Sequence, residues 1–103
     1  MNDWSLRLAQ PDDAESFHTV EDDAATLMHE EPSLDGVPIP PSGSAEHYRK
    51  LIKRGHCLSA IIDSELVGFA AAGAVGREIH LNELSVARVH QGRGIGAGLL
   101  EAM

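Results

Sequence analysis

The sequence has little cysteine and no long apolar run. Cys57 is its single cysteine, so no disulfide can form within the chain, and this usage is typical of a reducing compartment. No apolar stretch approaches the roughly 20 residues that a membrane-spanning helix requires. The first residues carry neither the basic start nor the apolar core of a signal peptide. The sequence therefore predicts a cytoplasmic protein with no membrane partner.

Basic residues are scarce at the start of the chain. Residues 1–35 hold ten acidic residues and one basic residue, Arg7, whereas residues 36–103 hold six acidic and seven basic residues. A nucleic-acid-binding protein needs a basic surface, so this distribution argues against a nucleic-acid partner. Acidic runs usually solubilise an exposed helix face. A cationic partner such as an amine is the alternative.

The 103 residues suffice for one small domain over residues 1–103 that combines strands and helices. Alternating and apolar segments predict strands at residues 6–8, 56–62, 66–72 and 78–86. Apolar residues three and four apart predict helices at about residues 11–28, 44–54 and 92–103. The short turn at Asp63-Ser64 makes the strands on either side of it antiparallel. This order of elements predicts an α+β fold with a mixed, mainly antiparallel sheet flanked by helices.

The segment between the first two helices is expected to be a long loop. Residues 31–43 contain four prolines and two glycines, a composition that does not form regular structure. A loop of this length within a small domain often carries function. After it, Ser44 is expected to cap the second helix and Gly55 to end it.

Four glycines stand at alternate positions, 92, 94, 96 and 98, where a loop from the last strand meets the last helix. Without side chains, several backbone N–H groups can converge on one anion, and the helix N-terminus adds its positive partial charge. Arg93 can add a formal charge. The pattern therefore favours a phosphate or pyrophosphate ligand over a glycine-rich turn that only allows close packing.

Two common phosphate-binding motifs fit this loop poorly. A P-loop requires a lysine after its glycines, and none follows here. The dinucleotide fingerprint G-x-G-x-x-G/A is met formally by Gly92, Gly94 and Ala97. That fingerprint, however, follows the first strand of its fold and needs an acidic residue about 20 positions later.

The end of the chain resembles the acetyl-CoA signature of the GNAT superfamily of N-acetyltransferases. The tripeptide Leu84-Ser85-Val86 is followed, after a short spacer, by QGRGIG. Within that segment Gln91, Gly94 and Gly96 match Q/R-x-x-G-x-G/A position by position. The order of the preceding elements is also similar to the N-terminal half of that family.

The resemblance implies a three-layer, acyl-CoA N-acyltransferase-like α/β fold and direct acetyl transfer from acetyl-CoA to a primary amine of a small molecule or peptide. It implies no metal. The backbone of the loop would hold the pyrophosphate, and the strand edge would hydrogen-bond the pantetheine arm like an added strand. The cofactor-binding residues that it implies are Leu84, Ser85, Val86, Gln91, Gly92, Arg93, Gly94, Ile95 and Gly96.

Glu83 is the expected general base. It lies within an apolar strand, where burying a carboxylate without purpose or partner is expensive, and it resembles the family's base on this strand. The alternative is a structural carboxylate, paired with an arginine or solvated at the sheet edge. Strict alternation places Leu81 and Ser85 on the face of Glu83 and His80 on the opposite face, at the surface.

Three further residues have chemically capable side chains. Cys57 has no clear base beside it and is assigned to the core, in agreement with direct transfer. Tyr48 is assigned to packing. His90 precedes the glycine loop and is a lesser candidate for a phosphate contact.

The fold of the family continues past the last helix with another strand, a helix that usually supplies a tyrosine to protonate the leaving thiolate, and closing strands. We therefore expect the domain to be incomplete at its C-terminus or completed by another chain, and to bind cofactor weakly and turn over poorly by itself. Besides the acetyltransferase, two interpretations stay open. One is a noncatalytic CoA-binding or interaction module that forms a homodimer through its exposed last helix. The other is a fragment of a nucleotide-binding oxidoreductase.

Overall fold

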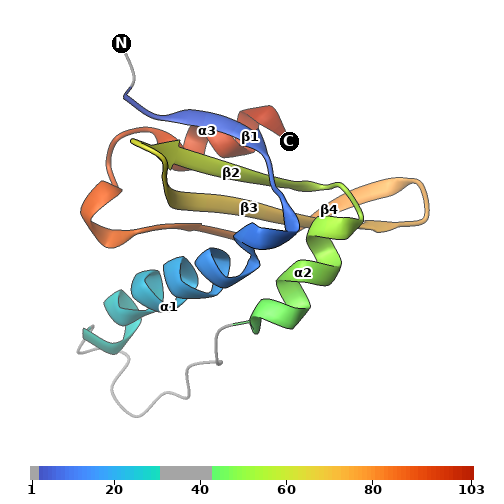
Figure 1. Cartoon of the computed structure of the whole chain (residues 1–103), viewed down its shortest axis with the longest axis horizontal. Helices are drawn as coiled ribbons and strands as arrows, with labels where there is room; N and C mark the ends of the chain where they lie inside the picture. Colours follow the sequence, from blue (N-terminus) through green and yellow to red (C-terminus); the bar gives the residue numbers. More distant parts are fainter. Residues whose placement is uncertain (1–2, 31–42) are drawn as a thin grey trace.

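The computed structural model describes residues 3–30 and 43–103. Within them a four-stranded sheet is flanked by helices on both faces (Figure 1). The short 3₁₀ helices η1 (Pro11–Asp13) and η3 (Arg88–His90) precede α1 and α3. The main elements in chain order are β1 (Ser5–Leu8), α1 (Ala14–Glu30), α2 (Ala45–Lys53), β2 (Cys57–Ile62), β3 (Glu65–Val75), β4 (Glu78–Val86) and α3 (Ile95–Ala102).

The strands lie in the order β1-β2-β3-β4, and each neighbouring pair is antiparallel. The predicted, mainly antiparallel sheet is confirmed. Asp63 and Ser64, with φ of 48° and 68°, form the two-residue turn between β2 and β3, the backbone conformation that suits a tight hairpin. The strands β3 and β4 are joined by a second tight turn at Gly76, whose φ is 62°.

Each face of the sheet has its own core. Helices α1 and α2 pack on one face and α3 on the other (Figure 1). On the α1/α2 face Phe69 stacks on Phe17 with ring centroids 4.2 Å apart and meets Tyr48 edge-on at 5.2 Å. The buried residues of this core are Ala14, Phe17, Val20, Tyr48, Leu51, Ile52, Cys57, Phe69 and Ala71. Those of the α3 face are Ala60, Val67, Ala70, Ile95 and Leu99.

The second helix begins and ends as expected. The Ser44 side chain accepts a hydrogen bond from the His47 amide at 3.1 Å, which satisfies a donor of the first turn. Gly55 follows the helix with φ of 86°, and its amide donates to the Ile52 carbonyl. The expected loop over residues 31–43 lies outside the described residues except for Gly43.

The start of the last helix was predicted too early. The helix α3 begins at Ile95, whereas the sequence suggested residue 92 or 93. The physical reason is that Gly92 and Gly94 have φ of 83° and 85°. A left-handed backbone cannot be part of a right-handed helix, so the two glycines form the loop before it.

A bulge in β4 changes which side chains share a face. Ala71 pairs with Glu83 and Ala72 with Leu81, so Asn82 is an extra residue without a partner across the ladder. Alternation therefore breaks at this point. His80 pairs with Gly73, beside Leu51 of α2, so it lies on the same face as Glu83, while Leu81 lies on the opposite one. The prediction from strict alternation was wrong for His80 and Leu81.

Candidate active site

The glycine loop presents open backbone at the start of α3. A Cβ added at Gly92, Gly94 or Gly96 would meet no atom within 4 Å, so these glycines are not there to let another element pack closely. Gly98 differs, because a Cβ there would lie 2.5 Å from the Trp4 ring. The first three glycines therefore fit the ligand-binding interpretation of the loop, and the fourth is a packing position.

A cavity of about 230 Å³ lies against this loop. Backbone amides in the first turn of α3 have no acceptor within the helix, and the partial positive charge of the helix end is directed at the same place. The residues that line the cavity are Leu84, Val86, His90, Gln91, Gly92, Gly94, Ile95 and Gly96. The cavity thus gathers seven of the nine residues that the sequence assigned to the cofactor, and leaves out the side chains of Ser85 and Arg93.

Arg93 and Gln91 hold the loop in place. The Arg93 guanidinium pairs with Asp3 at 3.0 Å, and the Arg93 carbonyl accepts a hydrogen bond from Trp4 Nε1 at 3.3 Å. The Gln91 side-chain amide donates to the Val86 carbonyl at 3.0 Å. Both side chains therefore fix the loop to neighbouring segments, and the positive potential at the cavity comes from the backbone and the helix end.

His90 lines this cavity and also a second cavity of about 260 Å³ bordered by α1 and β3. Its Nδ1 is buried and has no hydrogen-bond partner, the one such side-chain atom among the described residues. Buried polar atoms are nearly always paired. At the glycine loop itself, the open backbone and the helix N-terminus fit a ligand that carries anionic groups.

The outer edge of β4 is open along the same cavity. β4 is the last strand in the order of the sheet, so no strand among residues 3–30 and 43–103 pairs with that edge. Leu84 and Val86 border the cavity from this edge. An extended ligand segment can hydrogen-bond such an edge as an added strand would.

Glu83 lies on the other face of β4, toward α1 and α2. Its Oε1 accepts a hydrogen bond from Ser85 Oγ at 3.1 Å. Burial raises the pKa of Tyr48, and so do its hydrogen bond to Glu21 and the charges of Glu21 and Glu83. Glu83 is therefore close enough to α1 and α2 to act on Tyr48.

Glu21 of α1 makes contacts that sequence reasoning did not predict. Its Oε2 accepts hydrogen bonds from the Tyr48 hydroxyl and from the Gly43 amide. In the sequence Glu21 lies four residues after Phe17 and three before Ala24, within the apolar stripe of the first helix. A glutamate inside such a stripe was the available signal, the same signal that singled out Glu83 in its strand.

The assignments of Cys57 and Tyr48 to the core are confirmed, since both are 2% exposed. Burial raises the pKa of the Cys57 thiol, which keeps the thiol in its unreactive protonated form. His80 is exposed and lies 3.3 Å from the Glu78 carboxylate.

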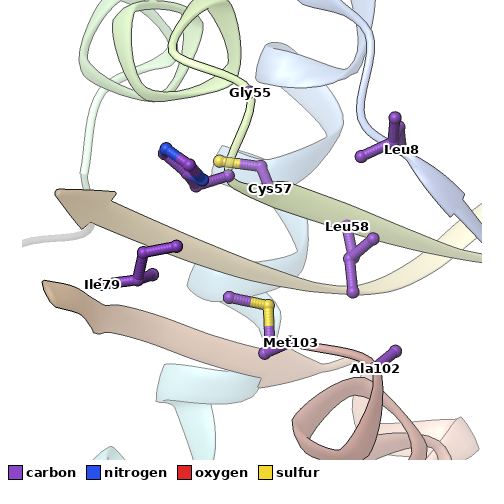
Figure 2. A pocket seen from close by; sticks show the side chains of 8 residues that line it. Leu8, Gly55, Cys57, Leu58, Ile79, Ala102 and Met103 are labelled. Carbon is purple, nitrogen blue, oxygen red and sulfur yellow. The ribbon is translucent and has the colours of Figure 1, made fainter. Parts of the chain in front are cut away.

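A smaller cavity of about 140 Å³ lies beside the end of α3. Figure 2 shows Met103 between Ile79 of β4 and Leu58 of β2, with Leu8 of β1 nearby. The lining is mostly apolar. It offers neither the open backbone amides nor the helix N-terminus of the larger cavity.

Within the described parts of the chain, no three His, Cys, Asp or Glu side chains are grouped as metal ligands would be. The helices found in the same parts are too short or too polar to cross a membrane.

Solved structures share this fold. PaiA N-acetyltransferase from Thermoplasma acidophilum, in complex with coenzyme A, superposes with a TM-score of 0.75 at 19% identity, over 99% of this chain and 69% of that one. Ard1 from Thermoplasma volcanium superposes with a TM-score of 0.73 at 18% identity, over 98% of this chain and 61% of that one. For the ribosomal-protein-S18-alanine N-acetyltransferase from Escherichia coli the TM-score is 0.72 at 17% identity, over 96% of this chain and 56% of that one. The chain thus spans between about half and 70% of their lengths.

A family model settles the relationship that the fold suggests. The acetyltransferase (GNAT) family model matches residues 11–103, which is nearly the whole chain and includes the glycine loop and Glu83. This match leaves the oxidoreductase interpretation without support. The chain belongs to the acetyltransferase (GNAT) family.

Proposed function

We propose that this chain is the acetyl-CoA-binding part of an N-acetyltransferase that moves an acetyl group directly to a primary amine of a small molecule or peptide. The observation that carries the proposal is the open glycine cradle at the start of α3, beside the free edge of β4. The similarity to a structure that is itself in complex with coenzyme A supports this choice of ligand.

The loop and the strand edge have separate tasks in this proposal. Backbone N–H groups from Gln91 to Gly96 and the positive end of α3 bind the pyrophosphate. The edge of β4 at Leu84–Val86 holds the pantetheine arm, and His90 Nδ1 gains a polar neighbour. When bound, acetyl-CoA supplies the activated acetyl thioester.

Glu83 acts as the general base. A primary amine is mostly protonated at neutral pH and must lose that proton before it can attack the thioester carbonyl. A carboxylate at Glu83 accepts the proton directly or through water. Cys57 is not a nucleophile in this scheme, because its thiol is buried in the core and held protonated.

The acceptor approaches from the α1/α2 face. The charges of Glu21 and Glu83 both raise the pKa of Tyr48, so both carboxylates act at this face of the sheet. Paired negative charges favour a cationic acceptor, as an ammonium group is. Fold relatives named for an aminoglycoside and for the alanine of a ribosomal protein illustrate a small-molecule and a peptide acceptor.

The second candidate function is a noncatalytic CoA-binding or interaction module. The observation in its favour is the exposure of Leu100 on α3 and of Met103 directly after it, at 52% and 44%. Apolar side chains exposed together on a helix suit a contact with a second protein chain. Such a module would bind acetyl-CoA without turnover.

Turnover with amines tests the proposal. Thiol release from acetyl-CoA is measured with an aminoglycoside and with an alanine-initiated peptide, for the parent chain and for Glu83→Gln. We expect kcat in Glu83→Gln to fall roughly 100-fold at neutral pH, because a glutamine cannot take the proton. Acetyl-CoA affinity should not change.

Glu101→Gln, at an exposed position of α3, is the matched control and should keep the parent rate. An unaltered rate in Glu83→Gln would remove Glu83 as the base. Acetyl-CoA binding without acetylation of either amine would favour the noncatalytic module.

A further inference from the structure

Ser85 is a buried polar residue whose side chain has no place in the scheme above. It is 7% exposed, and the scheme uses only the backbone around it. Its hydroxyl donates to Glu83 Oε1 at 3.1 Å, from two residues further along the same face of β4. A buried hydroxyl without a partner is costly, so this bond also satisfies Ser85.

The packing of Ser85 makes it the more rigid partner in its hydrogen bond with Glu83. Ser85 lies opposite Phe69 in the ladder between β3 and β4. Phe69 is fully buried and held by Phe17 and Tyr48. Glu83, by contrast, has a long side chain with several rotatable bonds. A hydrogen bond from a fixed hydroxyl therefore selects one orientation of the Glu83 carboxylate.

The β4 bulge explains why Glu83 needs such a contact. Asn82 is the extra residue of the bulge, and its side-chain amide lies on the α1/α2 face, 3.1 Å from where a Cβ at Gly73 would be. Two successive side chains, Asn82 and Glu83, thus crowd onto one face where regular pleating would separate them.

The other titratable groups on this face do not replace Ser85. Tyr48 of α2 donates its hydroxyl to Glu21 of α1. His80 of β4 is exposed beside Glu78. Cys57 of β2 is buried and protonated in the core. Among the described residues, Ser85 is the hydrogen-bond donor recorded for the Glu83 carboxylate.

We propose that Ser85 is a positioning residue for the general base: its hydroxyl holds the Glu83 carboxylate in one orientation toward the acceptor face. The inference rests on the proposed role of Glu83. Removing the hydroxyl leaves the carboxylate free to rotate away from the acceptor.

The molecule contains a matched control for Ser85. Ser59 of β2 also lies opposite Phe69, on its other side, and is fully buried. Its hydroxyl also donates to a carboxylate, Asp13 Oδ2, at 2.9 Å. Ser59→Ala therefore removes the same group from the same layer of the core, next to a carboxylate that has no part in catalysis.

The experiment compares Ser85→Ala, Ser85→Thr, Ser59→Ala and Glu83→Gln with the parent chain. The values of kcat and of KM for the amine are measured together with acetyl-CoA affinity and thermal unfolding of each variant. A positioning role lowers kcat and leaves acetyl-CoA affinity intact, whereas a merely structural role lowers the unfolding temperature alone.

We expect Ser85→Ala to lower kcat roughly three- to tenfold, as the loss of a hydrogen bond to a charged group implies. Acetyl-CoA affinity should not change. Ser85→Thr keeps the hydroxyl and should restore the parent kcat. Ser59→Ala should lose stability without a fall in kcat.

A kcat in Ser85→Ala equal to that of the parent would overturn the proposal, and so would a kcat that Ser59→Ala lowers as much. If Ser85→Ala does not fold, Ser85→Cys keeps the volume with a weak donor and should give the same fall in kcat. Failure of the proposed function shows separately, as an unaltered rate in Glu83→Gln.

Discussion

At the scale of single residues, the carboxylates of Asp13 and Glu83 each accept a hydrogen bond from a buried serine. Asp13 accepts hydrogen bonds from Arg7 at 2.6 and 3.0 Å, from the Gln10 amide at 2.9 Å and from Ser59 at 2.9 Å. Burial by itself would raise the pKa of Asp13, but these donors and the charge of Arg7 hold that pKa below its usual value. Asp13 thus ties β1 to η1 and β2.

The lowered pKa of Asp13 predicts how stability depends on pH. Its folded pKa lies below the ordinary value of 3.8, so the stabilisation is complete above that value and is lost as the pH falls through the lower folded one. Asp13→Asn should lower the free energy of unfolding at neutral pH by about 1–3 kcal/mol and flatten its acid dependence. Thermal unfolding between pH 7 and 2.5 measures both.

Asp12→Asn is the control for the charge change, because Asp12 is exposed and adjacent in the same turn. It should leave the acid dependence of unfolding intact. Parallel pH curves for Asp13→Asn and the parent would contradict the stabilising role of the Asp13 network.

The sequence predicted correctly which single residues are buried, where the prediction required nothing but burial. Cys57 and Tyr48 are core residues as predicted. It missed Asp13 and Glu21, because their partners come from other elements: Ser59 is 46 positions from Asp13, and Tyr48 is 27 from Glu21. Acidic residues in an acidic stretch look solvated until the fold brings a donor to them.

At the scale of elements, the bulge within β4 and the glycine loop that follows the strand shape the candidate site. The strand itself was predicted with the bounds that the structure gives, Glu78–Val86. The bulge at Asn82 was not predicted, because it depends on the register with β3 and has no mark in the sequence of β4 alone. The glycine loop was recognised, but its left-handed residues delay α3 to Ile95.

The glycine loop leads to a prediction at this scale. Gly94→Glu should abolish measurable acetyl-CoA binding, since it adds bulk and negative charge at the pyrophosphate position and strains a residue with φ of 85°. Gly55→Glu is the matched control: its φ is 86°, a Cβ there also meets open space, and it lies at the end of α2.

Both variants should lose about 1–2 kcal/mol of stability from the left-handed backbone, but only Gly94→Glu should lose the ligand. Isothermal titration and thermal unfolding of the two variants separate these effects. Retained affinity in Gly94→Glu would place the phosphate site elsewhere.

At the scale of the whole molecule, β4 contributes side chains to both faces of the sheet. Leu84 and Val86 border the cavity on the α3 face, whereas Glu83 and Ser85 face α1 and α2. In the proposed function the cosubstrate therefore lies along the outer edge of β4, with the base on the acceptor side of the same strand. Because side chains alternate between the two faces of a strand, cosubstrate binding and proton transfer would use opposite faces of β4.

The overall architecture was predictable because its signals are local. Hairpin turns, a serine cap and apolar periodicity predicted the four strands and three helices. The glycine signature predicted the family, which the match over residues 11–103 confirms. The pairing of Arg93 with Asp3 and the packing of Gly98 on Trp4 were not predictable. Both join the two ends of the described chain, which only the folded molecule brings together.

The measurement that tests the central claim most directly is a calorimetric titration of the 103-residue chain with acetyl-CoA, with NAD as the control ligand. We predict saturable binding of acetyl-CoA and none of NAD, because the loop and the open strand edge suit a pyrophosphate with a pantetheine arm. Equal binding of both ligands, or no acetyl-CoA binding by a folded sample, would contradict the assignment of the glycine loop as the acetyl-CoA site.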